Sequence, residues 1–249
     1  MLIELVADIA TLGLSVACAY ALLKVYARRR QPHWTAPLGR RRLAVLALLT
    51  LAVSAIKVIE DVLAKESGPV DEAILWFIRD HLPAALVDVF AAITLSGSAR
   101  VLVPLAAVAA LALLAARRWF EALLLGGSLL ASSLLVYGLK ALVGRARPDL
   151  WQTPWYWGSS FPSGHTLNTA ALSTAAALCV ARLWPRWATP AASLALLWTG
   201  AVALSRLVIG VHWPSDVLAA FCLGAFIPLS ASVVFDLRRR RPTPDQPRQ

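Results

Sequence analysis

The chain has 249 residues, of which 59% are hydrophobic and 15% are charged, and its mean hydropathy is +0.66. This composition lies outside the range of soluble globular domains and predicts an all-α, polytopic membrane helical bundle. The formal net charge of +10 does not indicate a nucleic-acid partner, because the basic residues are spread over several connections and form no continuous patch.

Seven apolar segments approach the roughly 20 residues that cross a bilayer as a helix. The predicted spans are residues 2–26, 43–63, 101–116, 120–139, 166–183, 188–204 and 217–235. We expect the first to be a helix of the mature protein and not a signal peptide. Its acidic residues Glu4 and Asp8 lie near its start and its basic cluster follows the apolar run, which is the reverse of signal-peptide polarity.

The arginines indicate how these spans are oriented. Residues 28–42 hold six arginines, and further arginines lie at or beyond the ends of the third, fifth and seventh spans, at Arg117, Arg118, Arg182, Arg186 and 238–241. If the spans alternate, all these clusters share one face, which the positive-inside rule makes cytoplasmic. The sequence therefore predicts a cell-membrane protein with its N-terminus outside and its C-terminal tail inside.

The connection between the second and third spans has a different character. Residues 65–98 are acidic on balance, and their apolar residues recur with helical spacing. These apolar residues are Val70, Ile74, Leu75, Phe77 and Ile78. We expect an amphipathic helix that lies at the outer membrane interface.

The first polar block follows the fourth span. Lys140 ends that span, and Arg147-Pro148 comes seven residues later, beyond Gly144. Because these cations lie on the outer side, topology does not account for them, and a bound phosphate is the obvious partner. Taken alone, the block is equally well explained by cations that snorkel at a helix end, and Arg145 fits that explanation better than Arg147 does.

The second polar block, Pro162-Ser163-Gly164-His165, opens the fifth predicted span. Proline and serine favour a helix start, and glycine allows a ligand to approach the backbone. Free N–H groups at a helix N-terminus bind anions, so His165 would lie beside a bound anion. An isolated histidine here would more often be a simple interfacial hydrogen-bonding residue.

The third polar block holds Ser205-Arg206, His212 and Asp216, with Pro214 at the start of the last span. The spacing of four residues lets the Asp216 carboxylate bind one nitrogen of His212 and leave the other free to attack. The plainer explanation is a capping aspartate with an unrelated histidine. All three polar blocks fall on the predicted outer side.

Other residues have less specific interpretations. The aromatic residues Trp151, Trp155, Tyr156 and Trp157 favour the headgroup level, either as plain anchors or as a headgroup pocket. The three cysteines, at positions 18, 179 and 222, lack metal-ligand spacing and are expected to be small buried hydrophobes.

Position by position, the three polar blocks resemble the signature of the type 2 phosphatidic acid phosphatase superfamily. That signature is Lys, six residues, Arg-Pro; then Pro-Ser-Gly-His; then Ser-Arg, five residues, His, three residues, Asp. Residues 140–148, 162–165 and 205–216 follow it in order and without departure. The superfamily includes membrane lipid phosphatases, bacterial acid phosphatases and vanadium haloperoxidases, and the resemblance is closest in kind to its bacterial membrane lipid phosphatases.

The resemblance implies a six-helix core over residues 43–236. Residues 1–42 would add one extra N-terminal transmembrane helix with a basic cytoplasmic loop, and residues 237–249 would form a basic, disordered cytoplasmic tail. The role of the added helix and the oligomeric state stay open.

The resemblance also implies a mechanism. Lys140, Arg147, Ser163, Gly164 and Arg206 would hold the phosphate and stabilise the transition state. His212 would attack phosphorus to give a phosphohistidine, Asp216 would fix its tautomer, and His165 would protonate the leaving group and then activate water. Neither a metal nor a cofactor is implied.

The expected substrate is a lipid phosphate or diphosphate of the outer leaflet, reached sideways from the membrane. Undecaprenyl diphosphate, phosphatidylglycerophosphate, phosphatidate and lipid A phosphates all stay open, since the signature specifies only the phosphate. One alternative is a phosphatase for a soluble substrate such as a sugar phosphate. Others are a transporter, which would hold its ionisable residues near the bilayer midplane, and a non-catalytic scaffold, which would be expected to have lost a histidine or the aspartate.

Overall fold

The computed structural model describes residues 2–83, 85–153 and 158–238. Within them the chain forms helices only. In chain order these are α1 (Leu2–Arg30), η1 (Pro32–Trp34), α2 (Thr35–Arg40), α3 (Arg42–Leu63), α4 (Gly68–His81), α5 (Ala85–Ser96), α6 (Ala99–Ala115), α7 (Trp119–Val143), α8 (Gly164–Leu183), η2 (Pro185–Trp187), α9 (Ala188–Val208) and α10 (Pro214–Arg238). The expected all-α fold is therefore confirmed.

Six of these helices are long and apolar enough to cross a membrane, and the pair α5 and α6 makes a seventh candidate span that is bent by 42°. The sequence predicted this third crossing as residues 101–116, which is α6 alone. The structure extends it back to Ala85, because α5 continues the apolar run across a break of two residues. The protein is a multi-pass membrane protein, and the bent pair α5 and α6 is the candidate for its third crossing.

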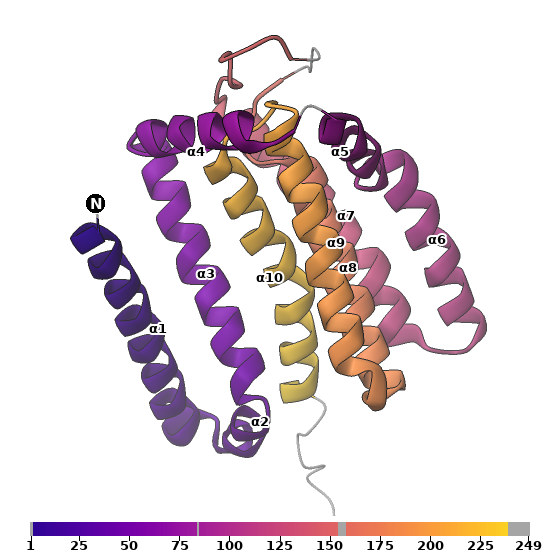
Figure 1. The fold of residues 1–249 in the computed structure, drawn as a ribbon. Helices are drawn as coiled ribbons and strands as arrows, with labels where there is room; N and C mark the ends of the chain where they lie inside the picture. The colour runs from indigo at the N-terminus through magenta and orange to yellow at the C-terminus, as the bar shows by residue number, and fades with distance from the viewer. Residues whose placement is uncertain (1, 84, 154–157, 239–249) are drawn as a thin grey trace, which may run out of the picture.

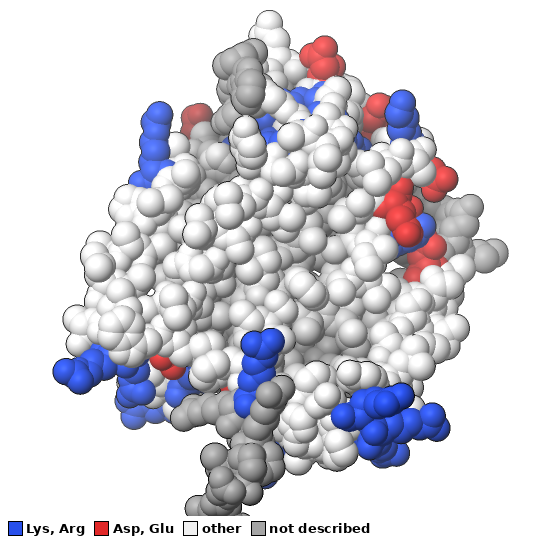
Figure 2. Space-filling model, turned by 180° about the vertical axis from the view of Figure 1, so that it is seen from behind, with Lys and Arg blue, Asp and Glu red and all other residues white. Residues whose placement is uncertain are grey.

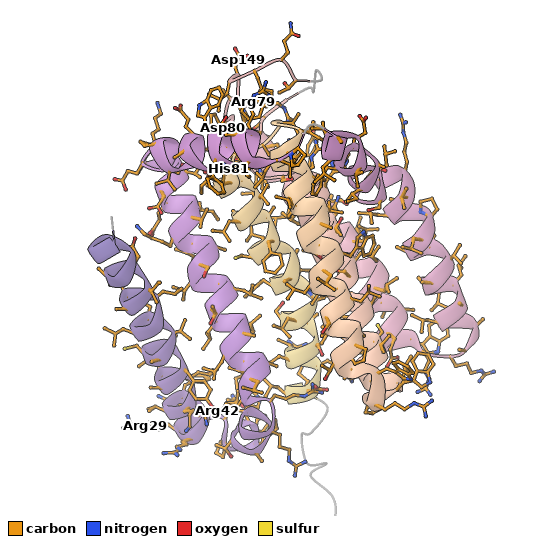
Figure 3. The ribbon with its side chains drawn as sticks, viewed as in Figure 1. Arg29, Arg42, Arg79, Asp80, His81 and Asp149 are labelled. Carbon is orange, nitrogen blue, oxygen red and sulfur yellow. The ribbon has the colours of Figure 1, made fainter. Side chains whose placement is uncertain are left out.

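Charged side chains gather at the two ends of the helical bundle. The face in Figure 2 has a broad belt without Lys, Arg, Asp or Glu between two charged ends. Arg29 and Arg42 lie at one end, whereas Arg79, Asp80, His81 and Asp149 lie at the other (Figure 3). We call the first the basic end and the second the site end.

Helix α4 lies across the site end, above the tips of the spanning helices (Figure 1). Its inner face holds the fully buried Leu75, whereas Val70 and Phe77 are each 62% exposed. The helix lies where the sequence predicted it, but its faces do not divide as expected: of the five apolar residues only Leu75 is buried, and the other buried residue of α4 is Asp71. The helix ends at His81, however, and the rest of the stretch that the sequence grouped with it belongs to the bent third crossing.

Helices α8 and α10 form the centre of the bundle, and half of the most apolar stretch of each is buried. They touch at Gly224, where a Cβ would collide with the carbonyl oxygen of Leu167. Since both helices begin at the site end, this contact sets the distance between the polar blocks at their N-termini (Figure 1). By contrast, α1 lies at the edge and packs against α3, α2 and η1.

Replacing Gly224 with alanine is expected to push α8 and α10 apart and to destabilise the protein by about 1–3 kcal/mol. The matched control is Gly127→Ala on α7, where a Cβ meets no atom within 4 Å. Thermal unfolding of both variants in one detergent tests this expectation. Equal melting temperatures would show that the helices do not meet closely at Gly224.

The outcomes for the less specific predictions differ. Cys179 and Cys222 are buried as expected, but Cys18 is exposed on α1, so that prediction is wrong for Cys18. The aromatic residues at 155–157 and the basic tail from residue 239 onward lie outside the described residues.

Candidate active site

All three polar blocks lie at the site end, where α7 and α9 finish and α8 and α10 begin (Figure 1). The side chains are close enough to interact electrostatically across the blocks. Lys140 interacts in this way with Arg147, Asp216 and Arg206, and His165 with Arg206, His212 and Lys140. The structure thus brings the predicted site residues together from three segments that are spread over residues 140–216.

The end of α7 directs the first block toward the site. Gly144 adopts a left-handed conformation (φ 61°), and its N–H group bonds to the Lys140 carbonyl at 3.3 Å, which terminates the helix. The guanidinium of Arg147 then donates to the Val211 carbonyl at 2.8 Å and lies 3.4 Å from Nε2 of His212. The amine of Lys140 donates to the backbone carbonyl of Ser159. Both cations are thereby fixed beside the third block.

The second block forms the start of α8 and lies next to the third block. Ser163 is fully buried at the N-cap position, and its hydroxyl lies 3.0 Å from that of Thr166. Its N–H group donates to the carbonyl of Asp216 at 3.3 Å, which links the start of α8 to the first turn of α10. The next two residues, Gly164 and the half-buried His165, open the helix at this junction.

The third block contributes a buried arginine. Arg206, near the end of α9, is only 1% exposed, and its Nη1 donates to the hydroxyl of Thr94 at 2.7 Å. Thr94 lies on α5, so the bent third crossing positions this cation. A charge buried to this extent requires compensating partners, and a phosphate would provide one.

His212 lies between a cation and a carboxylate. Its Nδ1 is 3.5 Å from Oδ2 of Asp216, which is itself fully buried and accepts the N–H of Trp213 at 2.9 Å. Its Nε2 faces Arg147. Because a guanidinium has no lone pair, Nε2 must be the unprotonated nitrogen, and the proton on Nδ1 points to Asp216. This tautomer leaves Nε2 able to attack an electrophile.

Burial lowers the pKa of the His212 imidazole from its usual 6.5 to about 4. The Asp216 carboxylate raises this pKa, but the effect of burial is larger. A lowered pKa favours the neutral ring, so His212 carries no proton on Nε2 at any pH well above 4. We expect its titration midpoint near pH 4. Nitrogen-15 NMR of the labelled histidines, with the His212→Ala spectrum to assign the signal, measures this midpoint directly. A midpoint at or above 6.5 would mean that the ring is solvated or that the carboxylate dominates.

The position of Arg145 differs from the one that the sequence suggested. It is not a cation that snorkels to the interface: its side chain is 16% exposed and bridges two carboxylates, with Nη1 2.7 Å from Oδ1 of Asp216 and Nη2 2.7 Å from Oδ2 of Asp71. It also donates to the hydroxyls of Ser215 and Ser67 at 2.8 and 3.1 Å. Sequence reasoning missed both Arg145 and Asp71, although Asp71 is an acidic residue in the first turn of an amphipathic helix.

Trp151 also lies closer to the site than an interfacial anchor requires. Its indole covers Gly210, where a Cβ would meet the ring at 2.7 Å, and it packs edge-on against Trp76 at 5.6 Å. The guanidinium of Arg79 lies 4.7 Å from its ring centroid. Gly210 precedes His212 by two residues, so this cluster covers the turn that carries the histidine.

Comparison with known proteins identifies the family. The profile of the PAP2 superfamily matches residues 121–240, which contain all three blocks. Lipid A 1-phosphatase of Rhizobium johnstonii is 37% identical over 114 residues, which are 42% of this chain and 43% of that protein. Decaprenylphosphoryl-5-phosphoribose phosphatase of Mycobacterium tuberculosis is 36% identical over 117 residues, covering 45% of this chain and 59% of that protein. This chain therefore matches only about half the length of these relatives.

The fold agrees with a solved member of the same superfamily. The crystal structure of a transmembrane PAP2 type phosphatidylglycerolphosphate phosphatase from Bacillus subtilis aligns with a TM-score of 0.65 and 26% identity. The alignment covers 76% of this chain and 99% of that one. It confirms the expected polytopic helical bundle. By its fold and its matched sequence, the chain belongs to the PAP2 superfamily.

Proposed function

We propose that this protein is a metal-independent phosphatase that hydrolyses a lipid phosphomonoester or diphosphate through a phosphohistidine intermediate. One observation carries the proposal: the neutral His212 presents Nε2 beside Arg147 and directs Nδ1 toward Asp216, at a site surrounded by buried and half-buried cations. A nucleophilic nitrogen next to cations that hold a phosphate is the arrangement that phosphoryl transfer to histidine needs.

In the first step the phosphate binds to Lys140, Arg147 and Arg206, with the Ser163 hydroxyl and the Gly164 N–H at the start of α8. Nε2 of His212 forms a bond to phosphorus as the bond to the leaving oxygen breaks. The imidazolium that results is stabilised by Asp216 through Nδ1–H. The cations neutralise the charge on the equatorial oxygens, which is where positioned charge contributes most to catalysis.

His165 completes the reaction. Its imidazolium protonates the leaving oxygen in the first step, and the neutral ring then accepts a proton from water as the water attacks the phosphohistidine. The products are the dephosphorylated alcohol, or monophosphate, and inorganic phosphate. Its position at the start of α8, where the N–H group of Ser163 bonds to the carbonyl of Asp216, supports this role.

The distribution of charge supports a site on the extracytoplasmic side. Arginines at the opposite end include Arg29 and Arg42 (Figure 3), and Figure 2 shows basic side chains clustered there. By the positive-inside rule this end, with the end of α10, faces the cytoplasm. The catalytic unit would then be residues 43–236, with α1 as a peripheral addition and residues 237–249 as a cytoplasmic tail.

The location of the site supports a lipid substrate over a soluble one. The site lies at the tips of spanning helices, next to the interfacial helix α4, where a headgroup from the adjacent leaflet can reach it. The Rhizobium and Mycobacterium relatives are named as phosphatases of lipid A and of a decaprenylphosphoryl sugar. We therefore extend the proposal to a lipid of the outer leaflet, with a sugar phosphate as the competing substrate.

Phosphate release by the purified protein in EDTA tests the proposed function. The panel contains phosphatidylglycerophosphate, phosphatidate, undecaprenyl diphosphate, lipid A and glucose 6-phosphate, with phosphatidylcholine as a phosphodiester control. We expect turnover of at least one lipid, and inhibition of that turnover by vanadate. Turnover of glucose 6-phosphate alone would reject the lipid substrate, and activity that EDTA abolishes and a divalent ion restores would reject the mechanism.

A further inference from the structure

Asp71, Arg145 and Asp216 form a polar cluster in which Asp216 belongs to the third block, whereas Asp71 and Arg145 are not among the signature residues. Asp71 is 2% exposed and Asp216 is fully buried. Arg145 lies between them with one 2.7 Å contact to each carboxylate. The cluster joins the interfacial helix α4, the connection after α7 and the catalytic helix α10.

Asp71 does more than pair with Arg145. Its Oδ1 accepts the backbone N–H of Ser215 at 2.9 Å, and its Oδ2 accepts the Ser215 hydroxyl at 2.5 Å. Ser215 lies in the first turn of α10, where backbone N–H groups lack partners within the helix. A carboxylate from α4 therefore caps the helix that carries Asp216, and it does so from 144 residues away in the chain.

The charges of the cluster have a direct consequence for His212. Asp216 uses Oδ1 for Arg145 and leaves Oδ2 for Trp213 and His212. Arg145 alone would neutralise the carboxylate on which the phosphohistidine depends. With Asp71 on its other side, the two carboxylates and one guanidinium keep one negative charge in excess, which faces His212 in a buried site where charges interact strongly.

We propose that Asp71 and Arg145 are positioning residues for the phosphoryl transfer: Arg145 holds Asp216 in place, and Asp71 restores the negative charge that Arg145 removes from the carboxylate facing His212. This inference rests on the proposed function, since it assigns Asp71 and Arg145 roles in forming the phosphohistidine. It also makes α4 part of the catalytic apparatus and not merely an interfacial anchor.

The test compares rates of phosphohistidine formation in a rapid-quench experiment with an aryl phosphate. Asp71→Asn keeps the shape of the side chain and removes its charge, so Arg145 neutralises Asp216, and we expect about tenfold slower formation. Affinity for vanadate, which the untouched Lys140 and Arg206 bind, stays within about twofold. The matched control is Glu72→Gln, the exposed neighbour on α4, which leaves the rate unchanged.

The double variant Asp71→Asn/Arg145→Gln distinguishes an effect of the charge on Asp216 from a purely structural role of the contacts between α4 and α10. It removes one charge of each sign and leaves Asp216 alone to face His212, so we expect it to recover most of the rate that Asp71→Asn loses. If α4 served only as a mechanical brace, the double variant would be at least as slow as the single one, and that result would overturn the proposal. An unchanged rate in Asp71→Asn would overturn it as well.

A third variant tests whether loss of the cluster's hydrogen bonds, without any change of charge, lowers the rate. Ser215→Ala removes the hydroxyl that Asp71 and Arg145 share but changes no charge, so we expect a rate lowered by at most a few-fold. A loss as large as that of Asp71→Asn would contradict the charge argument. If the wild-type protein formed no phosphohistidine, the proposed function itself would fail, and that outcome is distinct from normal formation that is insensitive to Asp71.

Discussion

Replacing His212 with alanine is expected to abolish the phosphoenzyme and to lower kcat by about 10,000-fold or more, as removal of a catalytic nucleophile does. The reason is geometric. His212 is the ring whose free nitrogen faces Arg147, and within the described residues its Nδ1 is the imidazole nitrogen that lies beside the buried Asp216. Rapid quench with a radiolabelled aryl phosphate measures the loss.

The control for His212→Ala is His81→Ala. His81 ends α4 at the same end of the molecule, is exposed, and has its Nδ1 2.9 Å from the Phe77 carbonyl. We expect this variant to keep the wild-type burst. A phosphoenzyme burst that survives in His212→Ala would show that another residue attacks phosphorus.

Replacing His165 with alanine is expected to have a large effect that depends on the leaving group. Turnover of a lipid phosphate should fall by about 100- to 10,000-fold, because an alkoxide must be protonated as it leaves. A p-nitrophenyl group leaves without a proton, so the phosphohistidine still forms with that substrate. Without a base to activate water, the phosphoenzyme then accumulates.

Parallel single-turnover experiments with the lipid and with p-nitrophenyl phosphate test this division of roles. We expect a burst of p-nitrophenol from His165→Ala, followed by slow steady-state turnover. Equal and complete loss with both substrates would mean that His165 acts before or during attack on phosphorus, in the way assigned to His212.

The residues that gather at the candidate site were predictable, because their sequence signal is local. Each block combines polar residues in an apolar chain with a helix start or end, as at Ser163 and Pro214, and the spacing of His212 and Asp216 indicates their contact. The structure places all three blocks at one end of the bundle, as alternation of the spans requires. A transporter would instead hold such residues near the middle of the spans.

The supporting contacts were not predictable, because they join distant segments. Arg145 lies 74 residues from Asp71, and Arg206 lies 112 residues from Thr94. Neither pair leaves a periodic or spacing signal, and Arg145 alone has the sequence environment of a snorkelling cation. One clue was available: a cation on the side opposite to the arginine clusters calls for an anionic partner, and the acidic stretch at residues 65–98, which contains Asp71, lies on that same side.

The bent third crossing was missed for a related reason. Residues 85–96 follow an acidic helix and lie before Gly97 and Ser98, so the sequence suggested an outer connection. In the structure α5 packs against α9, and a Cβ added at Gly97, directly after α5, would collide with Val202. Hydropathy gives the length of an apolar run, whereas its bend depends on packing against a helix more than one hundred residues away.

The central claim is that phosphate passes through His212. The most direct measurement quenches the reaction within milliseconds at alkaline pH and maps the phosphorylated peptide by mass spectrometry. We expect one phosphate, labile to acid and stable to alkali, on His212. Phosphate found on His165, or a reaction that proceeds through no phosphorylated residue, would contradict the account.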